Sequence, residues 1–301
     1  MNNYKIWMVI SLAIAFVAYP SGALYAAKKK RGGAPKSSGS GAANPNDPGG
    51  HSAAGVEAAK NKDYEKAIAE FSKAIEAEPK DAKNYFNRAT AYRGANKLSE
   101  ALADFSKAIE LAPQNAGGYI GRGEVLLQQK QLDQALADFD KALQLAPNDA
   151  SARRFRAYIY MAKSEWEKAI EDYGKVIQKV PDDEGAYERR AFAYRSLKKY
   201  KEAIADYSKA ISKDTSDPDG YRRRAYTHIL AGDNKAALSD FRAILKIKPD
   251  DVDAQNRLKA LETAGAAPPA PGASTPTAAA PGPVATPAVS PAMAPPGPSP
   301  R

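Results

Sequence analysis

Three features of the sequence predict an all-α solenoid of stacked two-helix units. An alanine and an aromatic residue recur together at fixed spacing, from Ala67 and Phe71 to Ala237 and Phe241. Apolar residues between these pairs recur in steps of three and four, the pattern of an amphipathic helix. Prolines follow the same 34-residue period at five places, with Thr215 in the one empty slot: Pro79, Pro113, Pro147, Pro181 and Pro249. A fixed period of this length indicates a repeat array.

The period divides residues 48–251 into six units, each predicted to form two helices. The first helix of a unit carries a small residue at its eighth position, such as Ala89 or Gly123. The second helix carries the alanine–aromatic pair and ends before the proline, which cannot continue a helix. Helices of about 12–14 residues are marginal alone, so stacking must stabilise them. Residues 252–263, with Leu258 and Leu261, are expected to add a capping helix.

The six units resemble tetratricopeptide (TPR) repeats. The resemblance implies a right-handed superhelical solenoid whose first helices line a concave groove for a peptide or a partner protein. Three places depart from the pattern: Thr215 replaces proline, Asn234 replaces a large side chain, and the first helix of the first unit is weak. Pro218 can still open the next helix after Thr215. We therefore expect a TPR domain over residues 51–263.

The N-terminal residues 1–27 are predicted to form a signal peptide or a signal anchor. Lys5 precedes an apolar run over residues 6–19, and small residues follow the helix breaker Pro20. Cleavage would give an exported protein, periplasmic or secreted. Without cleavage, the uncharged stretch is long enough to span a bilayer, and the basic residues 28–31 oppose translocation. The protein is therefore expected to be exported or membrane-anchored, and an anchored assembly factor with cytoplasmic repeats is the alternative.

Two segments of biased composition flank the predicted domain. Residues 28–50 are basic and rich in Gly, Ser and Pro, which predicts a flexible linker. Residues 264–301 are mostly Ala, Pro, Gly, Ser and Thr and are predicted to be disordered. The net charge of +9 has much of its excess in Lys28–Lys36, not in the repeats. Nucleic-acid binding is therefore not expected of the repeats, and binding of nucleic acid or of an anionic surface through Lys28–Lys36 remains an alternative.

An arginine and an acid recur with the same period. The arginine occupies the seventh position of units two to six, at Arg88, Arg122, Arg156, Arg190 and Arg224. The acid occupies the twenty-third position, at Asp104, Asp138, Asp172, Asp206 and Asp240, with Glu70 in the first unit. A stripe that reads a ligand is one interpretation. Matched periods favour structural ion pairs instead, within a unit or between neighbours, because a guanidinium can bind a carboxylate through two hydrogen bonds.

The resemblance also implies which positions of the first helices face a ligand. The groove would present Phe86, Asn87, Ile120, Arg154, Phe155, Tyr158, Arg189, Phe192, Arg222, Arg223 and Tyr226. Arginine mixed with aromatics suits a partner with acidic and apolar side chains, whereas the alternative is a merely solvated helix face. Asn87 is the one match to the carboxylate clamp of chaperone-binding TPR domains, so that device is not expected.

Catalytic and metal-binding chemistry finds no support in the sequence. The chain has no cysteine, and its two histidines, His51 and His228, are far apart. These residues give no metal-ligand spacing. The carboxylates follow the repeat period, and no glycine-rich phosphate loop follows a predicted strand. We therefore expect no enzymatic activity and no cofactor.

Overall fold

The computed structural model describes residues 48–266, which form thirteen helices and no strand within that range. The predicted signal or anchor, most of the linker and most of the C-terminal tail lie outside these residues. No helix within residues 48–266 is long and apolar enough to cross a membrane. The helices are α1 (Pro48–Lys60), α2 (Tyr64–Ala77), α3 (Ala82–Gly94), α4 (Leu98–Leu111), α5 (Ala116–Gln128), α6 (Leu132–Leu145), α7 (Ala150–Ala162), α8 (Trp166–Lys179), α9 (Glu184–Ser196), α10 (Tyr200–Lys213), α11 (Pro218–Leu230), α12 (Asn234–Ile247) and α13 (Val252–Ala266).

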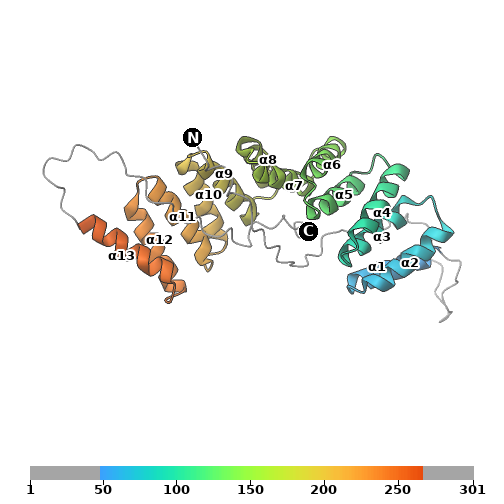
Figure 1. Ribbon diagram of the computed structural model, residues 1–301, viewed down its shortest axis with the longest axis horizontal. Helices are drawn as coiled ribbons and strands as arrows, with labels where there is room; N and C mark the ends of the chain where they lie inside the picture. The colour runs from blue at the N-terminus through green and yellow to red at the C-terminus, as the bar shows by residue number, and fades with distance from the viewer. Residues whose placement is uncertain (1–47, 267–301) are drawn as a thin grey trace, which may run out of the picture.

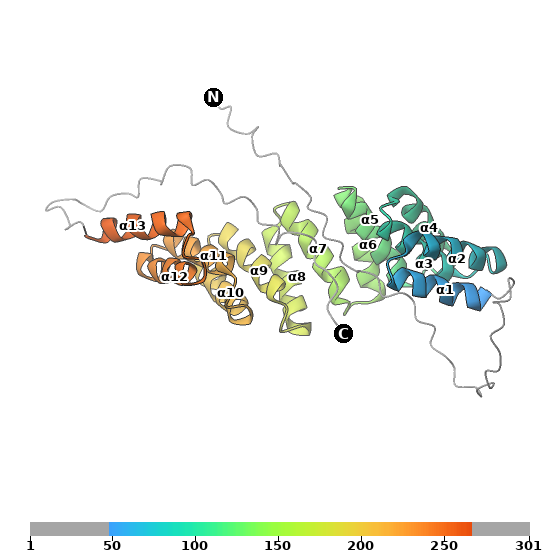
Figure 2. The ribbon, with the colours of Figure 1, turned by 90° about the horizontal axis from the view of Figure 1, so that it is seen from below.

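The helices pair into six hairpins that stack along an elongated, curved array, with α13 at its C-terminal end (Figures 1 and 2). Each second helix packs against its own first helix and against the first helix of the next repeat. First helices of adjacent repeats also touch, at α1–α3 and α3–α5. This arrangement confirms the predicted all-α solenoid of six repeats and its capping helix.

The periodic alanine and aromatic residues form the core of every repeat. Alanine at the twentieth position and the aromatic at the twenty-fourth are fully buried in all six units. A Cβ added at Gly55 would meet the Phe71 ring of the same hairpin at 2.7 Å. One added at Gly121 would meet the Phe105 ring of the preceding repeat at 2.3 Å. The ring therefore packs within its hairpin and against the next repeat, and small residues make room for it.

Aspartate or asparagine caps start the first helices of repeats two to six. The side chains of Asp81, Asn115, Asp149, Asp183 and Asp217 each accept a hydrogen bond from a backbone N–H of the first turn. Such caps satisfy amides that have no partner within the helix. Pro218 stands at the first position of α11, as expected, so the missing proline at Thr215 does not interrupt the array.

Each hairpin turn contains one residue with a left-handed backbone. Five of these residues are not glycine and have φ near +60°: Lys62, Asn96, Lys130, Ser164 and Lys198. The sixth repeat has Gly232 at the equivalent place, with φ of +82°. Because side chains disfavour this conformation, the stacked helices must hold the five turns in place.

Candidate binding face

The five seventh-position arginines are held inside the fold. Arg88 donates to Asp104 of its own hairpin through Nε (2.6 Å) and Nη2 (2.9 Å). The same two-bond contact recurs in every repeat from the second to the sixth: Arg122–Asp138, Arg156–Asp172, Arg190–Asp206 and Arg224–Asp240. The matched period thus reflects ion pairs within each hairpin. These arginines are structural residues.

A third donor of most of these arginines reaches the second helix of the preceding repeat. Nη1 donates to the hydroxyl of Ser72, Ser106 or Ser208 in three repeats and to the Asp140 carboxylate in a fourth. The corresponding place before Arg190 is occupied by Gly174. Each such arginine therefore joins three helices, which the sequence period alone did not reveal. In the first repeat the arginine position holds Ala54, and His51, three residues earlier, lies 2.6 Å from Glu70 instead.

Three residues of the predicted groove are buried. Asn87, Arg154 and Phe155 are 2%, 4% and 5% exposed. The Phe155 ring stacks on Phe139 with their centroids 5.2 Å apart, and the Arg154 guanidinium lies 2.6 Å from the Asp183 carboxylate. These side chains present little surface to a ligand.

Five apolar or aromatic residues of the predicted groove are only partly buried. They lie one per repeat on the first helices of repeats two to six: Phe86, Ile120, Tyr158, Phe192 and Tyr226. We call these five residues the first-helix row. Each packs its inner side on a core cluster formed by its own repeat or with the preceding one, as Phe192 does against Trp166 of the preceding repeat with ring centroids 5.9 Å apart. The row leaves a partly exposed apolar or aromatic side chain on each of five consecutive first helices.

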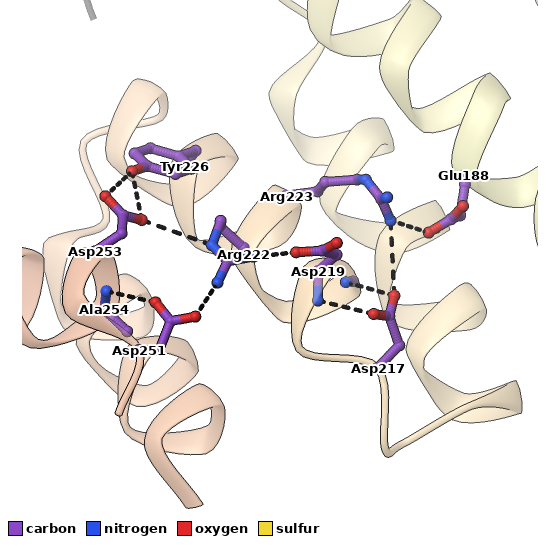
Figure 3. A network of polar contacts seen from close by, with 10 residues as sticks. Glu188, Asp217, Asp219, Arg222, Arg223, Tyr226, Asp251, Asp253 and Ala254 are labelled. Atoms are coloured by element: carbon purple, nitrogen blue, oxygen red, sulfur yellow. Dashed lines mark hydrogen bonds and ion pairs between the residues drawn. The ribbon is translucent and has the colours of Figure 1, made fainter. Parts of the chain in front are cut away.

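The arginines of the sixth repeat join a polar network that extends to the capping helix (Figure 3). Arg222 pairs with Asp219 and, at 2.5 Å, with Asp251, which also accepts a bond from the backbone N–H of Ala254. Arg223 pairs with Glu188 of the preceding repeat and lies 3.8 Å from Asp217. Burial raises the pKa of the Glu188 carboxyl, and the charge of Arg223 opposes that rise.

Tyr226 and Arg189 also have polar surroundings. The Tyr226 hydroxyl lies 2.9 Å from both carboxylate oxygens of Asp253 and accepts a 3.2 Å bond from Arg257. Burial raises the pKa of Tyr226, and its hydrogen bond to Asp253 adds to the rise. Burial raises the pKa of the Tyr158 and Tyr173 hydroxyls, and the positive charge of Arg189 opposes that rise. The sequence predicted these residues but not their partners. The aspartate or asparagine that recurs with the 34-residue period before the first helices was the available sequence signal for Asp183, and Asp251 continues the same period.

A further ion pair on the first helices was not predicted. Arg93 of α3 donates to Glu124 of α5, and both side chains are largely buried. Burial raises the pKa of Glu124, although Arg93 acts against the rise. The two residues occupy the twelfth and ninth positions of adjacent repeats. Opposite charges at these positions were the only sequence signal.

Comparisons with known proteins agree with the repeat geometry. A family model described as tetratricopeptide repeat matches residues 52–116, 86–150 and 120–187, and one described as TPR repeat matches residues 192–232. Together these matches cover more than half of the chain. The chain belongs to the tetratricopeptide repeat family.

Several solved structures share this TPR fold. YrrB, described as a TPR protein with an unusual peptide-binding site, is 23% identical. The match covers 63% of this chain and 97% of YrrB, with a TM-score of 0.58. MamA from Desulfovibrio magneticus RS-1 is 20% identical over 57% of this chain and 97% of its own, with a TM-score of 0.54. The hetero-tetramer Cut9–Hcn1 of the APC/C is 18% identical over 73% of this chain and 44% of its own, with a TM-score of 0.54. Such identities show the fold alone, and no curated protein sequence matches this TPR chain.

Within residues 48–266 of this TPR protein, no group of three or more His, Asp or Glu side chains is placed to hold a metal ion. The two histidines lie in different repeats. His51 contacts Glu70 in the first repeat, and His228 lies 3.6 Å from Asp233 in the sixth. Each histidine therefore has a carboxylate neighbour in its own hairpin.

Proposed function

We propose that this protein is a non-catalytic scaffold that binds a peptide or an extended segment of a partner protein along its first helices. The first-helix row is the observation that supports this function. Its five partly exposed apolar side chains lie on consecutive repeats, so a partner lying along the stack could contact all of them. Aromatic side chains anchored in a packed surface are typical centres of binding energy.

The charges beside the row make an apolar or aromatic partner a better fit than an acidic one. Arg154, Arg222 and Arg223 all have carboxylate partners within the chain. An acidic ligand would have to replace these pairs, and freeing a largely buried carboxylate has a high cost. We infer that the row supplies most of the binding energy and that the ion pairs hold the first helices in position.

The compartment is part of the proposal. We propose that the protein is exported, or anchored to a membrane through residues 1–27. The apolar run that follows Lys5 and the small residues after Pro20 support this location. Sequencing the N-terminus of the mature protein would decide between the two. A new N-terminus after Ala23 or Ala26 would support export, and an intact one in the membrane fraction would support an anchor.

The binding face can be tested with two matched variants. Phe192 on α9 and Ile177 on α8 are both partly buried and pack on the same core cluster. Peptides selected from a random library on the full chain would be titrated against Phe192→Gln and Ile177→Gln by calorimetry. We expect Phe192→Gln to lower affinity by roughly tenfold or more, because it removes an anchor of the row. Ile177→Gln is expected to retain affinity. Equal affinity for both variants would contradict the proposal.

A further inference from the structure

The seventh-position arginines lie against aromatic rings, and the residue four positions after the arginine is tyrosine in repeats two, four and five and His228 in the sixth. The tyrosine four residues after the arginine has its ring centroid 5.7 Å from Arg88, 5.8 Å from Arg156 and 5.9 Å from Arg190. In the third repeat the equivalent residue is Leu126. Arg122 therefore has the Tyr119 ring on one side, at 6.0 Å, and no tyrosine of its own repeat on the other.

A hollow lies where the tyrosine of the third repeat is missing. It has a volume of about 440 Å³ and is formed by α4, α5, the following turn and α6. The lining residues are Leu102, Ser106, Arg122, Leu126, Gln131, Gln134, Ala137 and Asp138. We call it the repeat-3 hollow. Leu126 is 6% exposed and packs in the core, so its side chain does not fill the space that a tyrosine ring would occupy.

A second hollow also lies where a tyrosine of the repeat pattern is missing. In the fourth repeat the tyrosine three residues before the arginine is replaced by Arg153. Repeats two, three, five and six have Tyr85, Tyr119, Tyr187 and Tyr221 at that position. A hollow of about 310 Å³ lies beside Arg153 and Arg156. Both hollows therefore coincide with the absence of a ring from the tyrosine–arginine stack.

The rim of the repeat-3 hollow is also unusual in having no charge. Gln131 and Gln134 stand where the fourth repeat has Glu165 and Lys168, which form an ion pair at 2.7 Å. The second and fifth repeats also have a lysine and a glutamate at these places. Within the hollow, both carboxylate oxygens of Asp138 accept bonds from Arg122. An apolar group could enter without stripping water from an unpaired charge.

We propose that the repeat-3 hollow binds an aromatic side chain of a partner protein, with tyrosine fitting best. The ring would lie on the face of the Arg122 guanidinium opposite Tyr119, as the chain's own tyrosines lie on the equivalent arginines. The amides of Gln131 and Gln134 can hydrogen-bond a phenolic hydroxyl at the rim. With 3.6 residues per turn, Arg122 lies about 160° and Leu126 about 120° around α5 from Ile120. The hollow is therefore a second contact surface, separate from the first-helix row.

The variant Leu126→Tyr tests this proposal because it supplies the missing ring from within the chain. The probe is p-cresol, which reproduces the tyrosine side chain, and the readout is the amide shifts of Gln131 and Gln134 in NMR spectra of the full chain. We expect p-cresol to shift these amides in the wild type and in the volume-conserving control Leu126→Met. Leu126→Tyr is expected to abolish the shifts. Ala137→Lys places a long side chain at the mouth from an exposed position on α6 and is expected to do the same if Leu126→Tyr does not fold.

Tyrosine-containing peptides selected on the full chain provide the second measurement. We expect Leu126→Tyr or Ala137→Lys to weaken those that use the hollow by roughly tenfold or more. Ile177→Gln, which lies in neither binding surface, is expected to leave their affinity unchanged. The absence of amide shifts in the wild type would overturn the proposal. Shifts of equal size in Leu126→Tyr and Ala137→Lys would also overturn it. Loss of binding in Phe192→Gln alone would place the site on the first-helix row.

Discussion

Arg190 holds the Asp206 carboxylate with two hydrogen bonds, from Nε at 2.7 Å and from Nη2 at 2.8 Å, across the α9–α10 hairpin. Asp206 is 6% exposed, and among residues 48–266 Arg190 is the arginine that compensates its charge. The equivalent Asp172 has a second arginine, because Arg153 Nη1 lies 3.3 Å away in addition to Arg156. Within the part of the chain that the structure describes, the aspartate of the fourth repeat therefore has a second arginine beside it, and the aspartate of the fifth does not.

Arg190→Ala is expected to lower the free energy of unfolding by about 3 kcal/mol, because it leaves a buried carboxylate unpaired. Arg156→Ala should cost less, since Arg153 stays near Asp172. Urea unfolding followed by circular dichroism measures both losses. Affinity for a selected peptide, measured on folded protein, should be unchanged in both variants. Equal losses of stability in the two variants would show that Arg153 does not compensate the charge of Asp172. A loss of peptide affinity without a loss of stability would show that the arginines bind the ligand.

Gly174→Ser is expected to stabilise the protein by about 1 kcal/mol. Serine here can accept a hydrogen bond from Arg190 Nη1, as Ser72, Ser106 and Ser208 do from the equivalent arginines. A Cβ at Gly174 would lie 3.5 Å from Arg190 Nη1, an ordinary contact, so there is room for the side chain. Replacing a helical glycine also adds helix propensity.

The matched control for this prediction is Gly174→Ala, which gains helix propensity but offers no acceptor. Alanine has the higher intrinsic helix propensity, by roughly half a kcal/mol. If the serine variant is at least as stable as the alanine variant in urea unfolding, the hydrogen bond to Arg190 has formed. A serine variant that is less stable than the alanine variant by the full difference in propensity would show that it has not.

Tyr173→Phe is expected to stabilise the protein by about 1 kcal/mol. The Tyr173 side chain is fully buried, and its hydroxyl has no hydrogen-bond partner among residues 48–266. A buried hydroxyl without a partner is costly, and phenylalanine fills the same place in four other repeats. Tyr226→Phe is the contrasting variant and should destabilise, because the Tyr226 hydroxyl bonds to Asp253 and Arg257. Thermal unfolding of both variants checks the opposite signs.

The fold could be predicted from the sequence because its determinants repeat. Ala101 and Phe105 have counterparts in every unit, and the proline at Pro113 recurs in every unit except the fifth, where Thr215 stands. Each helix boundary was therefore indicated several times. The pairing of Arg122 with Asp138 could be anticipated for the same reason. The arginine and the aspartate recur with the same 34-residue period, so they have the same relative position in each of these repeats. Its third contact, with Ser106, was not predicted, because it depends on the stacking of neighbouring hairpins.

The candidate binding face could be predicted only in part, because it depends on residues that differ between repeats. Sequence reasoning placed Tyr158 and Phe192 on the first helices, where they lie. It could not show that Arg154 and Arg223 are paired within the chain, because Asp183 and Glu188 approach them only once the repeats stack. The repeat-3 hollow was missed because it results from a ring that is absent.

Glu70 gives a prediction for the pH dependence of stability. Its carboxylate accepts hydrogen bonds from His51 and Lys73, which lower the pKa of Glu70 below its ordinary value. A carboxyl whose pKa is lower in the folded state stabilises the protein above its unfolded-state pKa, and this stabilisation is lost as the pH falls through the folded-state pKa. Glu70→Gln is therefore expected to be less stable than the wild type by about 1 kcal/mol near pH 6, since the site is partly open to solvent.

The difference between Glu70→Gln and the wild type should shrink as the pH falls below the ordinary range of a glutamate carboxyl, because the lowered pKa delays proton uptake by the wild-type carboxyl to that acidic range. Thermal unfolding of both proteins between pH 6 and pH 3 would measure it. Glu76→Gln, which changes an exposed carboxylate on the same helix, is the matched control and should stay close to the wild type throughout. A Glu70→Gln difference that is independent of pH would mean that the loss comes from packing. The contact with His51 would then not be the charge-assisted bond that replaces arginine in the first repeat.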